Sequence, residues 1–151
     1  MNRNEIGSPS WKSVMVTRHL PEKLSGLETL CKNLWWCWND NAKDLFKSID
    51  YNLWHKSGHN PMVILDKVSY KKYLALSQDE EFVARLDAVM QEFNSYMAKK
   101  AERREPSVGY FCMEYGLDTS LKIYSGGLGI LAGDYLKETS DMNVNLVAVG
   151  L

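Results

Sequence analysis

The C-terminal third of this chain alternates between apolar runs and a glycine-rich turn. A nearly continuous apolar run, SVGYFCMEYG, leads into the turn KIYSGGLG, and a second apolar run, VNLVAVGL, ends the sequence. The segment between them, LGILAGDYLKETSDMN, has the composition of a helix. Strand, turn, helix and strand in this order predict one βαβ unit, with parallel strands and a right-handed crossover. Continuous apolar runs are typical of strands that are buried on both faces of a sheet.

The chain before Pro106 has the spacing of helices, with apolar residues three and four positions apart. The predicted helical segments are 22–38, 42–49, a short turn within 50–58, a segment capped by Ser69, and 80–104 capped by Asp79. We therefore expect a fold of the α/β class in which a helical region, residues 1–105, precedes the opening of an α/β sheet, residues 106–151.

Apolar stripes on these segments predict the core. The expected core residues are Leu24, Leu27, Leu30, Cys31, Leu34, Trp35 and Trp38, then Ala42, Leu45, Phe46 and Ile49, then Phe82, Leu86, Val89, Phe93 and Met97. The aromatic run NLWWCWND also allows a carbohydrate platform, because aromatic rings stack on sugar faces. Core packing is favoured, with Trp35 and Trp38 inside and Trp36 or Cys37 pointing elsewhere.

A parallel two-stranded sheet is not a domain by itself. We therefore expect this chain to be the front piece of a longer protein. The exposed edge of its sheet would then allow the chain to associate as a homo-oligomer.

Composition excludes several classes of function. The formal net charge of −1 argues against a general affinity for nucleic acid or for an anionic membrane. No apolar run approaches the length of a membrane span, and the N-terminus lacks the apolar segment of a secretory signal. The three cysteines contain no CxxC pair and the three histidines are scattered, so we expect no metal site. A cytoplasmic location with reduced cysteines follows.

The glycine turn is the first candidate site. A turn between a parallel strand and a helix lies at the carboxyl end of the strand, where open α/β sheets bind ligands. Its glycines, Gly126, Gly127, Gly129 and Gly133, allow positive φ and a close approach of the backbone. The following helix N-terminus offers N–H groups to an anion. The spacing does not match a P-loop or a clean GxGxxG, so anion or sugar binding and a purely structural turn remain the alternatives.

Glu114 is the second candidate. It follows the first strand among apolar residues, where a carboxylate is costly unless it is paired, hydrogen-bonded or facing a cleft. A cleft-lining role is one interpretation of this position. The other is a salt bridge or a helix cap.

A resemblance to a known family enters at these residues. The segment YFCMEYGLDTSLKIYSGGLGILAGDYLKETSDMNVNLVAVGL resembles the N-terminal part of the catalytic region of α-glucan phosphorylases, most of all the shorter bacterial and archaeal type. The upstream segment LPEKLSGLETLCKNLWWCWNDNAKDLFKSID, together with LWHKSGHNPMVIL, resembles the helical extension of the same group. The glycine run alone is less specific, because glycogen and starch synthases carry a similar K-x-GGL turn.

The resemblance implies the first part of an enzyme with two Rossmann-like domains in the GT-B arrangement. Such enzymes use pyridoxal 5′-phosphate and inorganic phosphate to release glucose 1-phosphate from glycogen or maltodextrin. Gly126, Gly127 and Gly129 would belong to the substrate and phosphate wall, with the first two placing N–H groups near the phosphates. Leu128 would contact the glucosyl unit, and Glu114 would line the same catalytic cleft.

Two departures limit what carries over. Ile130 replaces the arginine of the long animal type, and Tyr115-Gly116 replaces its Phe-Tyr. The lysine that holds the cofactor lies in the other domain of the family, so this chain alone is expected to bind no pyridoxal phosphate and to be inactive. The alternatives are a nucleotide-sugar glucosyltransferase and a non-catalytic helical interaction module.

Overall fold

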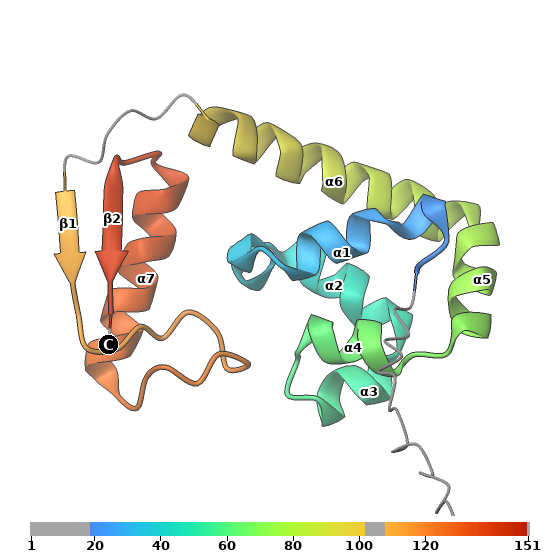
Figure 1. Cartoon of the computed structure of the whole chain (residues 1–151), viewed down its shortest axis with the longest axis horizontal. Coiled ribbons are helices and arrows are strands. Elements are labelled where there is room, and N and C mark those ends of the chain that lie inside the picture. The colour runs from blue at the N-terminus through green and yellow to red at the C-terminus, as the bar shows by residue number, and fades with distance from the viewer. Residues whose placement is uncertain (1–18, 102–107, 151) are drawn as a thin grey trace, which may run out of the picture.

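The computed structural model of this chain describes residues 19–101 and 108–150. These residues form a helical part and a separate βαβ unit beside it, with the longest helix running across the top (Figure 1). The helical part comprises η1 (Glu22–Leu24), α1 (Gly26–Cys31), η2 (Leu34–Trp38), α2 (Asp40–Ile49), α3 (Tyr51–Lys56), α4 (Pro61–Lys67), α5 (Tyr70–Gln78) and α6 (Glu80–Ala101), where η marks a 3-10 helix. The second part comprises β1 (Val108–Phe111), α7 (Gly127–Asp141) and β2 (Leu146–Val149).

Side-chain caps set the helix starts. The Asp79 carboxylate accepts hydrogen bonds from the N–H groups of Glu81 and Phe82, both at 3.1 Å, and the Ser69 hydroxyl accepts one from Lys72 N–H at 3.3 Å. Both caps were predicted from the sequence and are confirmed. Each satisfies N–H groups that a helix N-terminus leaves without an intrahelical partner.

The first predicted helix is interrupted, which corrects the expectation of a single segment 22–38. The α-helix ends at Cys31, and Asn33 then adopts an extended conformation while its side chain accepts a hydrogen bond from Trp35 N–H at 2.9 Å. This asparagine cap starts a separate 3-10 turn, as expected where an Asn side chain competes with the helical backbone. The tighter turn buries Trp36 and leaves Trp38 half-buried, so the predicted orientation of these two rings was wrong.

The core of the helical part is built around α2. Its predicted stripe is confirmed in full, since Ala42, Leu45, Phe46 and Ile49 are all buried. The Phe46 ring stacks on Trp54 with centroids 6.5 Å apart and meets the edge of Trp36 at 6.3 Å. Such aromatic contacts add to the free energy gained from burial.

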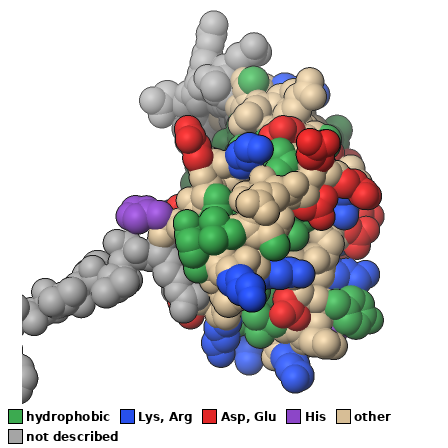
Figure 2. All heavy atoms as spheres, turned by 90° about the vertical axis from the view of Figure 1, so that its right-hand side faces the viewer, with side chains coloured by type: hydrophobic (Ala, Val, Ile, Leu, Met, Phe, Trp, Pro, Cys, Tyr) green, Lys and Arg blue, Asp and Glu red, His purple; other side chains and the backbone are tan. Residues whose placement is uncertain are grey.

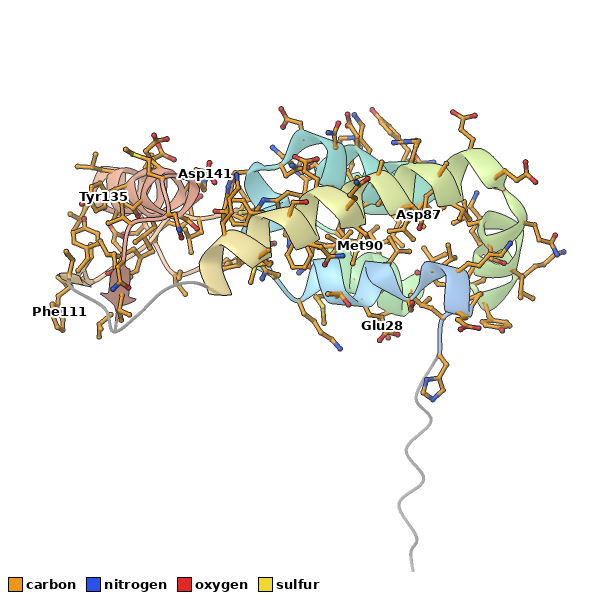
Figure 3. All side chains as sticks on the ribbon, turned by 90° about the horizontal axis from the view of Figure 1, so that it is seen from above. Glu28, Asp87, Met90, Phe111, Tyr135 and Asp141 are labelled. Carbon is orange, nitrogen blue, oxygen red and sulfur yellow. The ribbon has the colours of Figure 1, made fainter. Side chains whose placement is uncertain are left out.

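The long helix α6 packs along α1, α2 and α5. Phe82, Leu86, Val89 and Phe93 are buried as predicted, whereas Met97 lies beyond the core and is exposed. Met90 points toward α1 (Figure 3), where Gly26 leaves room: a methyl group there would lie 2.8 Å from Met90 Cγ. The remainder of the predicted helix, residues 102–104, falls outside the described residues.

The surface around α5 is that of an ordinary solvated face. Figure 2 shows acidic and basic side chains interspersed over it, with hydrophobic side chains in small groups between them. Among the described residues no helix combines the length and the apolar character that a membrane crossing requires.

The strands β1 and β2 are parallel, as predicted, with Val108 opposite Leu146 and Phe111 opposite Val149. Their predicted burial on both faces is wrong for this chain. Phe111 is 76% exposed, and Val108, Val147 and Val149 are each more than 40% exposed. Their apolar sequence is that of central strands, but α7 and two strands supply too few layers to cover both faces.

Specific contacts join the two parts. Trp38 Nε1 donates to Asp141 Oδ1 at 3.1 Å, and the hydroxyls of Tyr96 and Ser140 are 2.6 Å apart. Cys37 Sγ donates to the carbonyl of Leu117 at 3.4 Å. Helix α7 is therefore held against α6 and η2 at its C-terminal end, and its N-terminal end carries the glycine turn.

Candidate functional site

The Glu114 carboxylate lies against the glycine turn. Its Oε2 accepts hydrogen bonds from the Ser125 N–H at 2.5 Å and the Ser125 hydroxyl at 3.1 Å, and its Oε1 accepts one from Gly129 N–H at 3.0 Å. One side chain thus ties the loop after β1 to the first turn of α7. This is the capping arrangement that the sequence left open as an alternative.

The environment of this carboxylate favours its charged form. The pKa of Glu114 is lowered first of all by the Ser125 backbone N–H, and further by the Ser125 hydroxyl and the N–H groups of Gly129 and Gly126. Partial desolvation opposes this effect but does not reverse it. Hydrogen bonds donated to a carboxylate favour ionisation, so Glu114 carries a negative charge at neutral pH.

This lowered pKa predicts a pH-dependent contribution to stability. In the unfolded chain Glu114 titrates at about 4.3, and in the folded chain it titrates below that value. Its stabilising contribution is therefore fully present above the unfolded pKa and is lost as pH falls through the folded pKa. We expect the thermal unfolding midpoint of the wild type to exceed that of Glu114→Gln by a constant margin near neutral pH, and the margin to shrink in acid. A margin that widens on acidification would contradict this assignment.

Two glycines of the turn are required for close packing. A methyl group on Gly133 would lie 2.2 Å from the carbonyl oxygen of Gly116, and one on Gly129 would lie 2.5 Å from Tyr124 Cβ. The Gly116 N–H also donates to the carbonyl of Gly129 at 2.7 Å. The loop that follows β1 therefore crosses α7 backbone against backbone.

Positive φ, which the sequence suggested as a use of these glycines, plays no part at these four positions. Among the described glycines only Gly58 has a left-handed φ, whereas Gly126, at the start of α7, is extended with φ of −154°. Glycine is required at positions 129 and 133 because neighbouring atoms leave no room for a side chain there.

The first two glycines of the turn are open instead. Nothing lies within 4 Å of a methyl group placed on Gly126 or on Gly127. Leu128, the next residue, is 54% exposed. Within the described residues, no hydrogen-bond acceptor engages the N–H groups of Gly127 and Leu128. The first turn of α7 thus presents free donors at the positive end of a helix dipole.

A small apolar depression lies at the carboxyl ends of both strands. It has a volume of about 260 Å³ and is lined by Phe111, Cys112, Met113, Val149 and Gly150. The buried Tyr115 ties the loop after β1 to both strands, because its hydroxyl donates toward the carbonyls of Tyr110 at 2.9 Å and Val149 at 3.1 Å. Carboxyl ends of parallel strands are where α/β sheets bind ligands.

The structure brings Glu114, Gly126 and Gly129 into one cluster and leaves Gly127 and Leu128 at its open side. Sequence reasoning missed Ser125, which holds the carboxylate through both its N–H and its hydroxyl. The sequence does place a serine immediately before the glycines, and a serine can donate hydrogen bonds from both its backbone N–H and its hydroxyl.

Two of the cysteines, Cys31 and Cys37, are buried thiols. Burial raises the pKa of both Cys31 and Cys37 to about 11, so these thiols stay protonated at neutral pH. In the part of the chain that the structure describes, no three His, Cys, Asp or Glu side chains are grouped as metal ligands.

The architecture is that of a helical module joined to a βαβ unit whose strand-to-helix turn faces outward. Residues 20–121 match a family model described as "Protein of unknown function (DUF3417)", and the chain belongs to this family. The match passes through the boundary expected at residues 105 and 106, so that domain boundary stays a prediction.

The chain is similar in sequence to several curated proteins that are named as phosphorylases. The chain is 40% identical over 148 residues to the glycogen phosphorylase of Mycobacterium tuberculosis, covering 90% of this chain and 17% of that protein. It is 41% identical over 139 residues to the maltodextrin phosphorylase of Thermococcus litoralis, covering 87% of this chain and 17% of that protein. It is 41% identical over 128 residues to the glycogen phosphorylase of Aquifex aeolicus, with coverages of 83% and 18%.

These matches confirm the resemblance to α-glucan phosphorylases that was read from the glycine turn. The chain spans only 17–18% of the length of these relatives. No solved structure gives a significant match.

Proposed function

We propose that this chain is the N-terminal part of an α-glucan phosphorylase, and that the whole protein has the GT-B arrangement of two Rossmann-like domains. The observation that carries the proposal is the identity of about 40% to named phosphorylases across 90% of the chain, glycine turn included. In this proposal α1 to α6 form an extension before the first catalytic domain, which begins with β1.

The proposed reaction transfers a terminal α-1,4-linked glucosyl unit of glycogen or maltodextrin to inorganic phosphate. The bond from C1 to the leaving glucan oxygen breaks, a bond from C1 to a phosphate oxygen forms, and a proton reaches the leaving oxygen. A phosphate dianion needs fixed donors in a site that excludes water. The backbone of Gly126 and Gly127 would lie near the phosphates of the cleft, with the free N–H of Gly127 facing them while the Gly126 N–H is directed at Glu114, and Leu128 would contact the glucosyl ring.

Glu114 acts in this proposal as a positioning residue that lines the cleft. Its carboxylate holds Ser125 and Gly129, which lie on either side of the two open glycines. Because it fixes both ends of the five-residue stretch from Ser125 to Gly129, the donors of Gly127 and Leu128 would be oriented before the ligand binds. Pre-orientation of donors avoids reorganisation during the reaction.

Pyridoxal 5′-phosphate is the cofactor that this proposal requires, and its phosphate supplies acid and base chemistry to the substrate phosphate. The open N–H groups at the start of α7 suit a cleft that binds phosphate groups. The covalent lysine is expected outside these 151 residues, so the chain alone is expected to be inactive. A cytoplasmic location, a homo-oligomeric state and the lack of nucleic-acid and membrane partners belong to the same proposal.

One assay of the full-length protein tests the proposal. Maltodextrin and inorganic phosphate should give glucose 1-phosphate, and the purified protein should show the visible absorbance of bound pyridoxal phosphate. A nucleotide-sugar glucosyltransferase, which the shared K-x-GGL turn keeps as an alternative, would lack that absorbance and would extend glucan from ADP- or UDP-glucose. Transfer from a nucleotide sugar without phosphate-dependent release would overturn the proposal.

A further inference from the structure

The 3-10 turn η2 is joined to the βαβ unit through two neighbouring residues. Cys37 Sγ donates to the carbonyl of Leu117 at 3.4 Å, and Trp38 Nε1 donates to Asp141 Oδ1 at 3.1 Å. Leu117 lies in the loop after β1, and Asp141 is the last residue of α7. The aromatic run, whose sequence suggested core packing or sugar contact, thus also connects the two parts of the chain.

These two contacts act on opposite ends of α7. Gly116, which precedes Leu117, donates its N–H to the carbonyl of Gly129 in the first turn of α7 at 2.7 Å. The contact of Cys37 therefore reaches the N-terminal end of the helix, while the contact of Trp38 holds its C-terminal end. At 1.5 Å per residue this 15-residue helix is about 22 Å long. A tilt of about 3° around one end of such a helix would move the other end by about 1 Å.

Hydrogen bonds carry much of this joint because the space around it is not filled. A groove of about 670 Å³, whose lining includes Trp38, Tyr96 and Asp141, opens beside the bonds. The hydroxyls of Tyr96 and Ser140, which are 2.6 Å apart, add a further polar contact. Close-packed side chains resist the displacement of neighbouring elements, whereas an open groove leaves room for it. Removal of one bond would therefore allow α7 to shift.

Asp141 occupies a position that the dipole of α7 disfavours. The C-terminal end of a helix carries partial negative charge, which opposes a carboxylate in its last turn. Asp141 is exposed there, on the side of α7 that faces the helical part (Figure 3). Its bond to Trp38 is the favourable contact that offsets this repulsion. Removal of the Asp141 carboxylate should thus weaken the joint without weakening the helix.

We propose that Trp38 and Asp141 are positioning residues for the glycine turn, and that the helical part serves the reaction by holding α7 in place. The angle of α7 sets where the N–H groups of Gly127 and Leu128 lie. The inference rests on the proposed function for the ligand of the turn, but the contacts that carry it do not depend on that function. A displacement of about 1 Å at a reacting site can lower a rate about a hundredfold.

The kcat of the full-length Asp141→Ala protein tests this role. Phosphorolysis of maltopentaose should be about tenfold slower, a part of the loss that a full 1 Å shift would cause. Asp141→Asn keeps the Oδ1 acceptor and should recover most of kcat. Glu138→Ala is the matched control, because it removes another exposed carboxylate near the same end of α7, and its kcat should be unchanged. A wild-type kcat in Asp141→Ala would overturn the inference.

The donor side of the same bond gives a second variant. Trp38→Phe removes the indole N–H and keeps an aromatic ring. Because both substitutions break one bond, the double variant Trp38→Phe, Asp141→Ala should be no slower than the slower single variant. A role in stability alone would lower the melting temperature and leave the kcat of the folded enzyme unchanged. Effects on kcat that multiply in the double variant would contradict a shared bond.

Hydrogen exchange separates this inference from the phosphorylase assignment. In the full-length protein without substrate, amide exchange over residues 123–131 should be about fivefold faster in Asp141→Ala, as expected for the loss of one hydrogen bond. Glu138→Ala should exchange at the wild-type rate. Unchanged exchange in Asp141→Ala would overturn the inference whatever the activity. Faster exchange in a protein whose wild type forms no glucose 1-phosphate would contradict the phosphorylase assignment alone.

Discussion

Replacing Gly133 with alanine should destabilise the protein by about 3 kcal/mol, at the upper end of the cost of overpacking. The added methyl group would lie 2.2 Å from the carbonyl oxygen of Gly116 and 2.5 Å from its carbonyl carbon. Both are backbone atoms, so no flexible side chain can move away. Relief requires that α7 separate from the loop after β1, which would break the hydrogen bond from Gly116 N–H to Gly129.

Gly127→Ala is the matched control for this prediction. It adds the same methyl group six positions earlier in the same helix, where nothing lies within 4 Å. Its effect on the free energy of unfolding should stay within about 0.5 kcal/mol, as for other surface substitutions. Thermal or urea unfolding of both variants gives the comparison. Equal stability of the two variants would show that Gly133 is not tightly packed.

The second large effect is expected at Phe46, in the core of the helical part. Its side chain is fully buried between the rings of Trp36 and Trp54. Phe46→Ala would remove an aromatic ring and leave a cavity among rigid neighbours, at a cost of about 3–5 kcal/mol. Urea unfolding followed by tryptophan fluorescence should report the loss directly, because two of those neighbours are tryptophans.

Tyr70→Ala provides the reference for that measurement. Tyr70 is 52% exposed at the start of α5, so its truncation should change the free energy of unfolding by less than about 0.5 kcal/mol. If Phe46→Ala lowers the free energy of unfolding by less than about 1 kcal/mol, as at partly exposed sites, the rings of Phe46, Trp36 and Trp54 are loosely packed.

Regular helices could be predicted from the sequence because their signals are local. The stripe of α2 and the caps Ser69 and Asp79 depend on residues at most four positions apart, and all were predicted correctly. The parallel pairing of β1 and β2 followed from the order of elements, since two strands joined through a helix pair in parallel.

Other features depend on specific side-chain or backbone contacts and were missed. The break between α1 and η2 follows from a side-chain bond of Asn33 that apolar periodicity does not register. Gly129 and Gly133 are required because the loop that contains Gly116 packs closely against α7, and a sequence pattern does not register this packing. The sequence identified Glu114 as a costly carboxylate, but its partner Ser125 is eleven residues away.

The central claim is that the turn at Gly127 faces phosphate in an α-glucan phosphorylase, and the kcat/KM for inorganic phosphate of the full-length Gly127→Val enzyme tests it most directly. The larger side chain would occupy open space, so the fold should persist, while its methyl groups block the approach of the ligand to the backbone N–H groups. We expect kcat/KM for phosphate to fall about a hundredfold. Ala84→Val, an exposed change on α6, should leave it unchanged. A wild-type value in a folded Gly127→Val enzyme would contradict the claim.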